Sequence, residues 1–287
     1  MNEYNVEERM KKLEETFNNV LDRPWETAQS PLRMSEHCWY LGNTWVGVLL
    51  IDSGEGLILI DAGMPSQTYL IFEGIRSLGL NPKNIKKVLL THGHFDHCGG
   101  MTAILAYTRA EFWGPKEDLN AIRGISLNTR GRYYAPCEPD RFYQEDVPVI
   151  LGNICIFTMH TPGHTPGTTS FFFDDTLSSG QKVRVGIFGG LGANTLVMSD
   201  SLQDRAVVLQ NRKDYRQSLE RMEKEHVDVT MSIHPGMIRA FDRRSKDSKS
   251  YRQYIDPTVW PSTLKRYRER LDAIEAGEHT ENADGCR

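Results

Sequence analysis

The feature that most constrains this chain is a dense run of metal-binding side chains, Thr91-His-Gly-His-Phe-Asp-His97. It places three of the nine histidines and one carboxylate within six positions, directly after the apolar segment 88–90, which predicts a buried strand. Imidazole and carboxylate groups are ligands that zinc prefers in proteins. Because alternate residues of an extended loop point the same way, His92 and His94 can bind one ion together. Asp96 and His97 then face a neighbouring position.

Two further histidines lie in segments whose proline and glycine force tight turns. His164 lies within Thr161-Pro-Gly-His-Thr-Pro-Gly167, and His234 lies within Ser232-Ile-His-Pro-Gly236. Each follows a predicted strand, and catalytic loops gather at strand ends. The remaining histidines (His37, His160, His226 and His279) have no such context, so we expect ordinary core or surface roles for them.

Hydrophobic periodicity predicts alternating strands and helices. Strands are expected at 46–51, 57–60, 88–90, 154–159, 168–173, 183–188 and 227–233, and helices at 67–77, 99–107, 116–122, 215–225 and 262–276. Such alternation favours a layered α/β architecture in which helices cover sheets.

The two ends of the chain differ from this central part. Apolar residues recur at helical spacing over residues 1–20, which predicts an amphipathic helix for docking or homo-oligomer formation. After His234 the chain becomes basic and polar, then forms a helix and a tail, 278–287, that we expect to be disordered. We therefore divide the chain into an N-terminal helix and linker (1–36), a central domain (37–238) and a C-terminal extension (239–287).

Composition argues against several partners. The formal net charge of −4 gives no overall attraction to nucleic acid or to an anionic membrane. The first 20 residues hold no apolar run that could act as a signal peptide or membrane span, so we expect a cytoplasmic protein that acts on a small molecule. Five scattered cysteines without a CxxC pair predict reduced thiols.

Four motifs together resemble the metallo-β-lactamase superfamily, over roughly residues 39–236. They are the HxHxDH run, the TPGHTPG turn, the segment Leu59-Ile-Asp-Ala-Gly63 and the late His-Pro-Gly. The detail is most similar to the third subclass of metallo-β-lactamases, in which HFDHxGG, GHTPGtT and HPG recur with similar spacing. This resemblance implies an α/β fold, the four-layer αββα sandwich, with the metal ions at one edge.

The resemblance also implies roles for individual residues. One zinc ion would be held by three histidines (His92, His94 and His164) and a second by a mixed set (Asp96, His97 and His234). Asp61 would support the ligands from behind. A hydroxide shared by two Zn²⁺ ions would attack the carbonyl of a cyclic or activated amide or ester, and Asp96 would orient this nucleophile.

Two departures from the family pattern concern the segment after the predicted strand 183–188. Many superfamily hydrolases, including glyoxalase II, phosphodiesterases and homoserine-lactone lactonases, have a metal-bridging Asp there, whereas this chain has Gly189-Gly-Leu-Gly192. The third lactamase subclass places two serines for the substrate carboxylate at positions that align with Gly190 and Gly192. We therefore expect weak β-lactam turnover and better turnover of a neutral carbonyl substrate. If the loop tolerates the change, β-lactam turnover should increase when both glycines become serine.

Three alternatives remain open at this point. The first is a mononuclear iron oxygenase of the same fold, which one iron ion with oxygen consumption would indicate. The second is a lactonase or esterase with no β-lactam activity, which a hydrolysis screen would identify. The third is a binding module without catalysis, although such modules usually lose ligands and this chain keeps all six.

Overall fold

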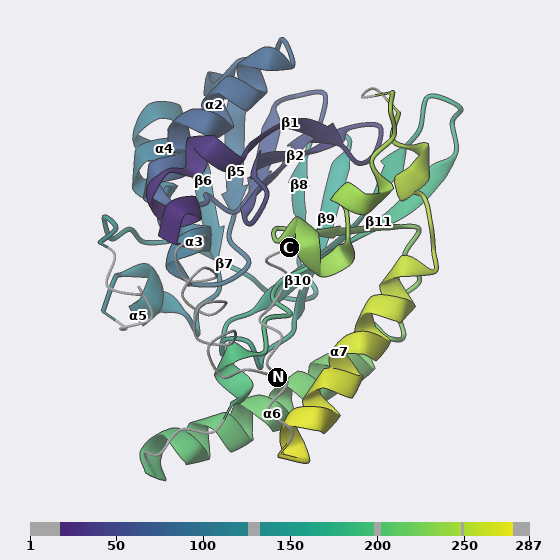
Figure 1. The fold of residues 1–287 in the computed structure, drawn as a ribbon. Coiled ribbons are helices and arrows are strands. Elements are labelled where there is room, and N and C mark those ends of the chain that lie inside the picture. The colour runs from purple at the N-terminus through teal and green to yellow at the C-terminus, as the bar shows by residue number, and fades with distance from the viewer. Residues whose placement is uncertain (1–17, 126–132, 198–201, 248–249, 278–287) are drawn as a thin grey trace, which may run out of the picture.

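Two β-sheets face each other, and helices cover both outer sides (Figure 1). The computed structural model describes residues 18–125, 133–197, 202–247 and 250–277. This arrangement confirms the predicted α/β sandwich of four layers.

The first sheet has seven strands and the second has five. In order across the first sheet they are β1 (Ala28–Arg33), β2 (Cys38–Asn43), β3 (Gly47–Asp52), β4 (Leu57–Ile60), β5 (Ile85–Leu89), β6 (Glu111–Gly114) and β7 (Arg141–Phe142). Across the second they are β12 (Val229–Ser232), β11 (Lys182–Phe188), β10 (Thr169–Thr176), β9 (Ile154–His160) and β8 (Val149–Leu151). All four residues of β4 and of β12 are buried, as expected of strands covered on both faces.

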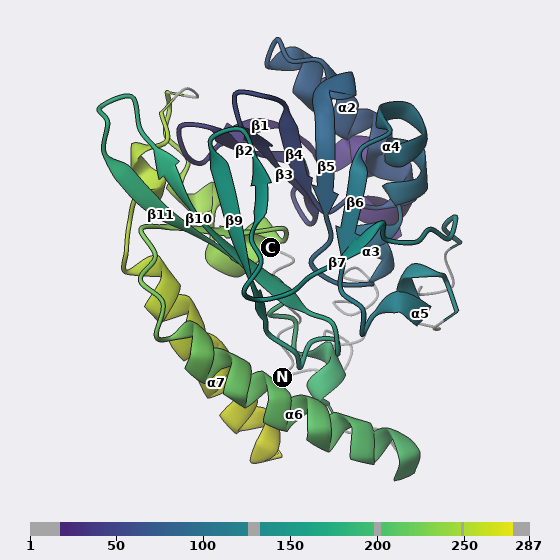
Figure 2. The ribbon, with the colours of Figure 1, turned by 180° about the vertical axis from the view of Figure 1, so that it is seen from behind.

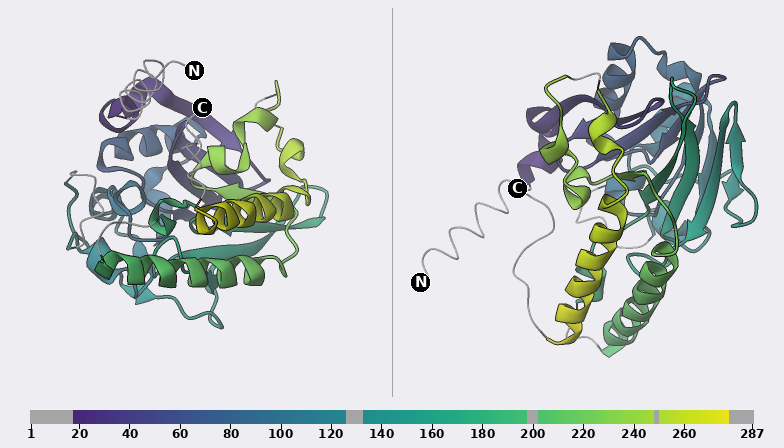
Figure 3. Two further views of the ribbon diagram at one scale, coloured as in Figure 1. Left: turned by 60° about the horizontal axis from the view of Figure 1, so that its bottom comes forward. Right: turned by 90° about the vertical axis from the view of Figure 1, so that its right-hand side faces the viewer.

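The outer layers consist of helices on opposite sides of the two sheets (Figure 2). They are α2 (Thr68–Ser77), α3 (Phe95–Cys98), α4 (Met101–Thr108), α5 (Leu119–Ile122), α6 (Leu202–Met222) and α7 (Val259–Glu275). The pair α6 and α7 lies side by side along the second sheet, whereas α2 lies over the first (Figure 3). On the second sheet, Trp260 of α7 stacks on Phe188 of β11, with ring centroids 3.9 Å apart and planes 3° apart.

The strands and helices predicted between residues 46 and 276 are all present, but the sequence missed several elements. Strands β1, β2, β6, β7 and β8 were not predicted, and α6 begins at Leu202, well before the expected start at residue 215. Strand β1 contains Pro31 and pairs only with β2, so it is an edge strand without clear alternation. The first part of α6 has mostly exposed side chains from residue 205 to 211 and therefore lacks the apolar stripe that would have revealed it.

Packing crosses both predicted domain boundaries. Strand β1 lies in the predicted linker yet belongs to the first sheet, and α7 lies in the predicted extension yet packs on the second. The three-part division stays a prediction. Residues 1–17, which hold most of the expected N-terminal helix, and the expected disordered tail fall outside the described residues. Within the described ranges, no helix is long and apolar enough to cross a membrane.

Parallel pairing fixes where the functional loops lie. Strands β4 and β5 run parallel in the first sheet, and β11 and β12 run parallel in the second. Because parallel strands end at the same edge of a sheet, the loops that follow them gather there. A hydrogen bond of 2.9 Å from the Thr169 amide to the Thr91 carbonyl joins the two sheets at this edge.

Candidate metal centre

The structure brings together all six side chains that the sequence singled out as metal ligands. They form two neighbouring groups, one of three histidines (His92, His94 and His164) and one mixed (Asp96, His97 and His234). In each group the candidate ligand atoms lie within 4.8 Å of one another. The groups are adjacent, since the ring centroids of His92 and His97 are 3.9 Å apart.

The spacing of the ligand atoms fits zinc. A tetrahedral ion with Zn–N bonds of 2.0–2.1 Å separates its ligand nitrogens by about 3.3 to 3.4 Å. In the first group, Nε2 of His92 lies 3.1 Å from Nδ1 of His94. In the second, Nε2 of His234 lies 3.2 Å from Nε2 of His97 and 3.3 Å from Oδ2 of Asp96. These three pairs suit a small tetrahedral cation, whereas Nε2 of His97 lies 3.7 Å from Oδ2 of Asp96.

Hydrogen bonds on the far side of the rings fix which nitrogen faces the centre. His92 donates from Nδ1 to the Gly189 carbonyl at 2.9 Å, and His164 donates from Nδ1 to the Gly192 carbonyl at 2.8 Å. These acceptors orient each ring and leave the Nε2 lone pair for a metal ion.

The second group is held in the same way. His234 donates from Nδ1 to the Trp45 carbonyl at 2.8 Å, and His97 donates from Nδ1 to Asp61 at 2.5 Å. The Nε2 lone pairs of His97 and His234 consequently face each other and repel unless a proton or a cation lies between them. No sequence pattern indicates the role of Trp45, which acts through its backbone carbonyl.

Asp61 lies behind the ligands, where the resemblance places it. Its carboxylate accepts hydrogen bonds from the Thr91 amide (2.6 Å), the Thr91 hydroxyl (2.7 Å) and His97. Its own backbone has φ of 65°, a conformation that non-glycine residues rarely adopt. This strained aspartate ties the end of β4 to the loop that carries the HxHxDH run.

The charges of the site suit metal binding. Burial, followed by the nearby His97 and His164, lowers the pKa of His92 well below its usual range, so its imidazole is neutral at neutral pH. Burial alone would raise the pKa of Asp96, but the charges of His97 and His234 and a hydrogen bond from His234 lower it overall. Neutral imidazole and ionised carboxylate are the protonation states that coordinate metal ions.

The predicted substrate positions Gly190 and Gly192 press against a candidate ligand. A Cβ atom at Gly190 would lie 2.6 Å from Cδ2 of His164, and one at Gly192 would lie 2.7 Å from Cε1 of the same ring. Contacts this short do not occur between carbon atoms, so a side chain there must displace either His164 or the loop itself. Serine at either position therefore requires a shift of His164 or of the loop, so the gain of β-lactam turnover, which depends on the loop tolerating the change, stays a prediction.

The other histidines within the described residues have ordinary partners. His37 pairs with Asp175, His160 with the Pro166 carbonyl and His226 with Asp228. His279 lies outside the described residues.

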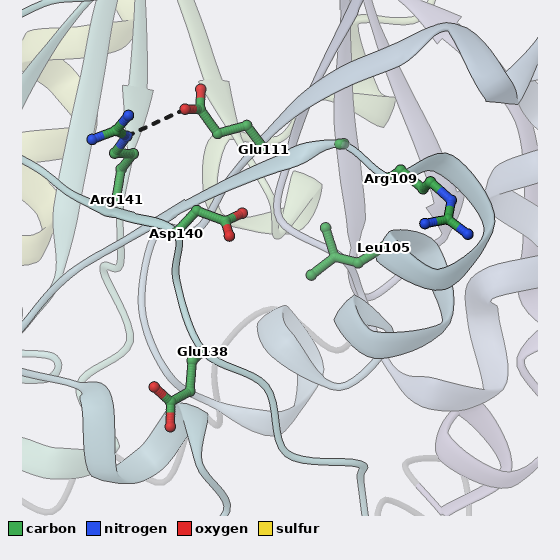
Figure 4. A pocket seen from close by; sticks show the side chains of 7 residues that line it. Leu105, Arg109, Glu111, Glu138, Asp140 and Arg141 are labelled. Atoms are coloured by element: carbon green, nitrogen blue, oxygen red, sulfur yellow. Dashed lines mark hydrogen bonds and ion pairs between the residues drawn. The ribbon is translucent and has the colours of Figure 1, made fainter.

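A separate pocket of about 520 Å³ lies between α4, β6 and β7 (Figure 4). Its lining residues are Leu105, Arg109, Ala110, Glu111, Glu138, Asp140 and Arg141, none of which belongs to the metal groups. Glu111 binds Lys87 and Arg141, and Asp140 accepts a hydrogen bond from the Phe112 amide. These acidic groups therefore serve the packing of the first sheet.

Comparison with known proteins finds relatives that are named as hydrolases or probable metallo-hydrolases. Residues 44–176 match the family model of the metallo-beta-lactamase superfamily. Hydroxyacylglutathione hydrolase GloC of Haemophilus influenzae is 29% identical over 128 residues, which cover 43% of this chain and 58% of the relative. Probable metallo-hydrolase YqgX of Bacillus subtilis is 26% identical over 178 residues, covering 59% of this chain and 82% of the relative. The aligned segment thus spans less than two thirds of GloC.

A solved structure matches over nearly the whole described fold. The subclass B3 metallo-beta-lactamase BJP-1 of Bradyrhizobium japonicum superposes with a TM-score of 0.79 at 25% sequence identity, covering 89% of this chain and 97% of that protein.

Two facing sheets carry a His/Asp cluster at the strand ends that could hold metal ions, and hydrolases are among the relatives of the chain. The segment 44–176 is similar to the metallo-β-lactamase superfamily, and the structural neighbours of the chain are subclass B3 metallo-beta-lactamases.

Proposed function

We propose that the protein is a zinc-dependent hydrolase that binds two zinc ions and cleaves a cyclic or activated ester or amide. The observation that carries this proposal is the pair of adjacent three-ligand groups, with His92 and His97 in ring contact between them. Three protein ligands for each ion leave a coordination position for water or substrate, which is typical of catalytic zinc sites. No serine or cysteine nucleophile is then needed.

Zinc bound in these groups would polarise the substrate carbonyl and lower the pKa of water to near neutrality. The chain's own residues supply orientation. Asp96 alone among the six candidate ligands has a second polar atom on the same face, so one carboxylate oxygen can bind metal while the other accepts a hydrogen bond from the attacking water. The low pKa of Asp96 keeps this acceptor ionised. The hydrogen bonds from His97 to Asp61 and from His234 to Trp45 keep both rings from turning away.

The substrate we propose is neutral around its reacting carbonyl. Gly190 and Gly192 provide no side-chain donor for a carboxylate, and their backbone leaves no room beside His164 for one. Losing two neutral hydrogen bonds of about 0.5 to 1.5 kcal/mol each corresponds to about one to two decades in catalytic efficiency toward β-lactams. Lactones, aryl esters and thioesters avoid this requirement, and the relative GloC is a hydroxyacylglutathione hydrolase.

Metal analysis and a hydrolysis screen test the proposal together. We expect zinc near two ions per chain and turnover of at least one lactone, aryl ester or thioester, with weak turnover of penicillins and cephalosporins. The variant to compare with the wild type is Asp96→Asn, which keeps the shape of the side chain and removes its charge. We expect this variant to lose turnover. One iron ion per chain with oxygen consumption, or turnover that Asp96→Asn leaves unchanged, would overturn the proposal. A nitrocefin efficiency at or above about 10⁵ M⁻¹s⁻¹ would overturn its substrate part.

A cytoplasmic location and a homo-oligomer formed through the N-terminal helix remain part of this proposal. Size-exclusion chromatography of the full chain beside a variant lacking residues 1–17 tests the second.

A further inference from the structure

A buried carboxylate that is not a candidate ligand connects the two loops of the first metal group. Asp118 is only 4% exposed. Its Oδ2 atom accepts hydrogen bonds from the Gly93 amide at 2.8 Å and from the Thr165 hydroxyl at 2.7 Å. Its Oδ1 atom accepts one from the Gly167 amide at 2.7 Å.

These three donors belong to the segments that carry the three histidines. Gly93 lies between His92 and His94, and Thr165 directly follows His164. One side chain therefore spans both halves of a group whose members are more than 60 residues apart in sequence, as the numbers 94 and 164 show. Hydrogen bonds to an ionised acceptor are about twice as strong as neutral ones, so this link is stiff.

The side chain of Asp118 does not cap the helix that this residue begins. It is the N-cap residue of α5, a place where aspartate usually accepts a hydrogen bond from the first turn. No such bond from the side chain is present at this cap. All three hydrogen bonds described above go to the ligand loops instead.

Two glycines make this close approach sterically feasible. A Cβ atom at Gly93 would lie 2.7 Å from Cβ of Ala121 and 3.1 Å from Cβ of Asp118. A Cβ atom at Gly167 would lie 2.6 Å from Cγ of Asp118. The glycines of the His-Gly-His and Thr-Pro-Gly segments thus allow the backbone to reach this carboxylate.

We propose that Asp118 is a positioning residue that sets the separation of His92 and His94 from His164 before a metal ion binds. The inference rests on the proposed function in one respect, namely that the three-histidine group binds zinc. Without the link, each loop would have to be ordered by the metal ion itself, which lowers affinity for the first ion and leaves the second group, held by Asp61 and Trp45, largely unchanged.

The test measures stepwise zinc binding by the full-length Asp118→Asn variant. The amide keeps the volume of the side chain but presents an NH₂ group to one set of donors. Competition with a chromophoric chelator gives the affinity of each ion, and cobalt(II) absorption distinguishes the three-histidine group from the mixed group. We expect about 10- to 100-fold weaker binding at the three-histidine group, the range for residues that orient metal ligands, and less than a threefold change at the mixed group.

A matched control is Asp175→Asn. Asp175 is also fully buried and accepts hydrogen bonds from the Ser35 hydroxyl (2.5 Å) and the His37 amide (3.1 Å), but it contacts none of the candidate ligands. We expect Asp175→Asn to lower the thermal midpoint without changing either zinc affinity. If Asp118→Asn lowers the zinc affinity of both groups equally, or of neither group, the positioning role is wrong.

A second variant, Thr165→Val, tests the same link if Asp118→Asn does not fold. It removes one of the three donors and should weaken the three-histidine group by about 3- to 10-fold, within the lower part of the range for such outer contacts. An unchanged affinity would contradict the proposal. A wild-type chain that binds zinc at both groups but hydrolyses nothing would refute the proposed function alone, because this test reads affinity and not turnover.

Discussion

Replacing Gly192 with alanine should remove the zinc ion from the three-histidine group. An added Cβ atom would lie 2.7 Å from Cε1 of His164, whereas ordinary contact begins at 3.4 Å, so the ring must move by the difference of 0.7 Å. Metal–ligand distances tolerate only about 0.2 Å. The same ring donates to the Gly192 carbonyl at 2.8 Å, so it cannot move without losing that bond. We therefore expect at least a 10- to 100-fold loss of affinity, about the cost of removing a contact that orients a ligand.

Chelator competition with zinc, followed by cobalt(II) absorption, measures this effect on the variant. The control is Gly79→Ala, because no atom lies within 4 Å of a Cβ at Gly79. That backbone has φ of +77°, so the control should lose about 1 kcal/mol of stability while both zinc affinities stay unchanged. Wild-type affinity in Gly192→Ala would refute the reasoning, since it would mean that the loop moves instead of the ring.

Two further predictions concern the metal centre, and a third concerns the contact between Glu36 and Tyr251. His164→Ala should lose about one zinc ion per chain and nearly all turnover, because one of three protein ligands is gone; metal analysis with any hydrolysed substrate of the screen checks this. His234→Ala should chiefly weaken the mixed group, so added zinc should restore part of the activity, and no recovery at any zinc concentration would assign His234 a structural role. Glu36→Gln should lower the free energy of unfolding by about 1 to 2 kcal/mol at pH 7, a reduced value for a partly exposed group. A hydrogen bond from Tyr251 lowers the pKa of Glu36 from 4.5 to about 2, so this difference should shrink as pH falls from 4.5 toward 2, and urea unfolding at pH 7 and pH 3 would show whether it does.

The sequence by itself determined the set of candidate ligands and the kind of fold. The six ligands stand in short segments whose residue types are rare outside metal sites, and each segment follows an apolar strand, so local pattern alone places them at strand ends. Strands with a continuous apolar run, such as β4, or with alternating burial, such as β9, were also readable from the sequence. Edge strands such as β1 were not, because pairing on one side leaves little pattern in the residues themselves.

Only the tertiary structure decided how the ligands are supported. Asp118 contacts Gly93 and Gly167 across gaps of 25 and 49 residues, and no local pattern predicts such pairs. The same holds for Gly192, which aligned with a substrate-binding serine but proved to press on His164. Spacing along the chain reports what a loop contains, whereas the distance between two loops depends on how the sheets pack, and that distance decides which side chains a metal site can accept.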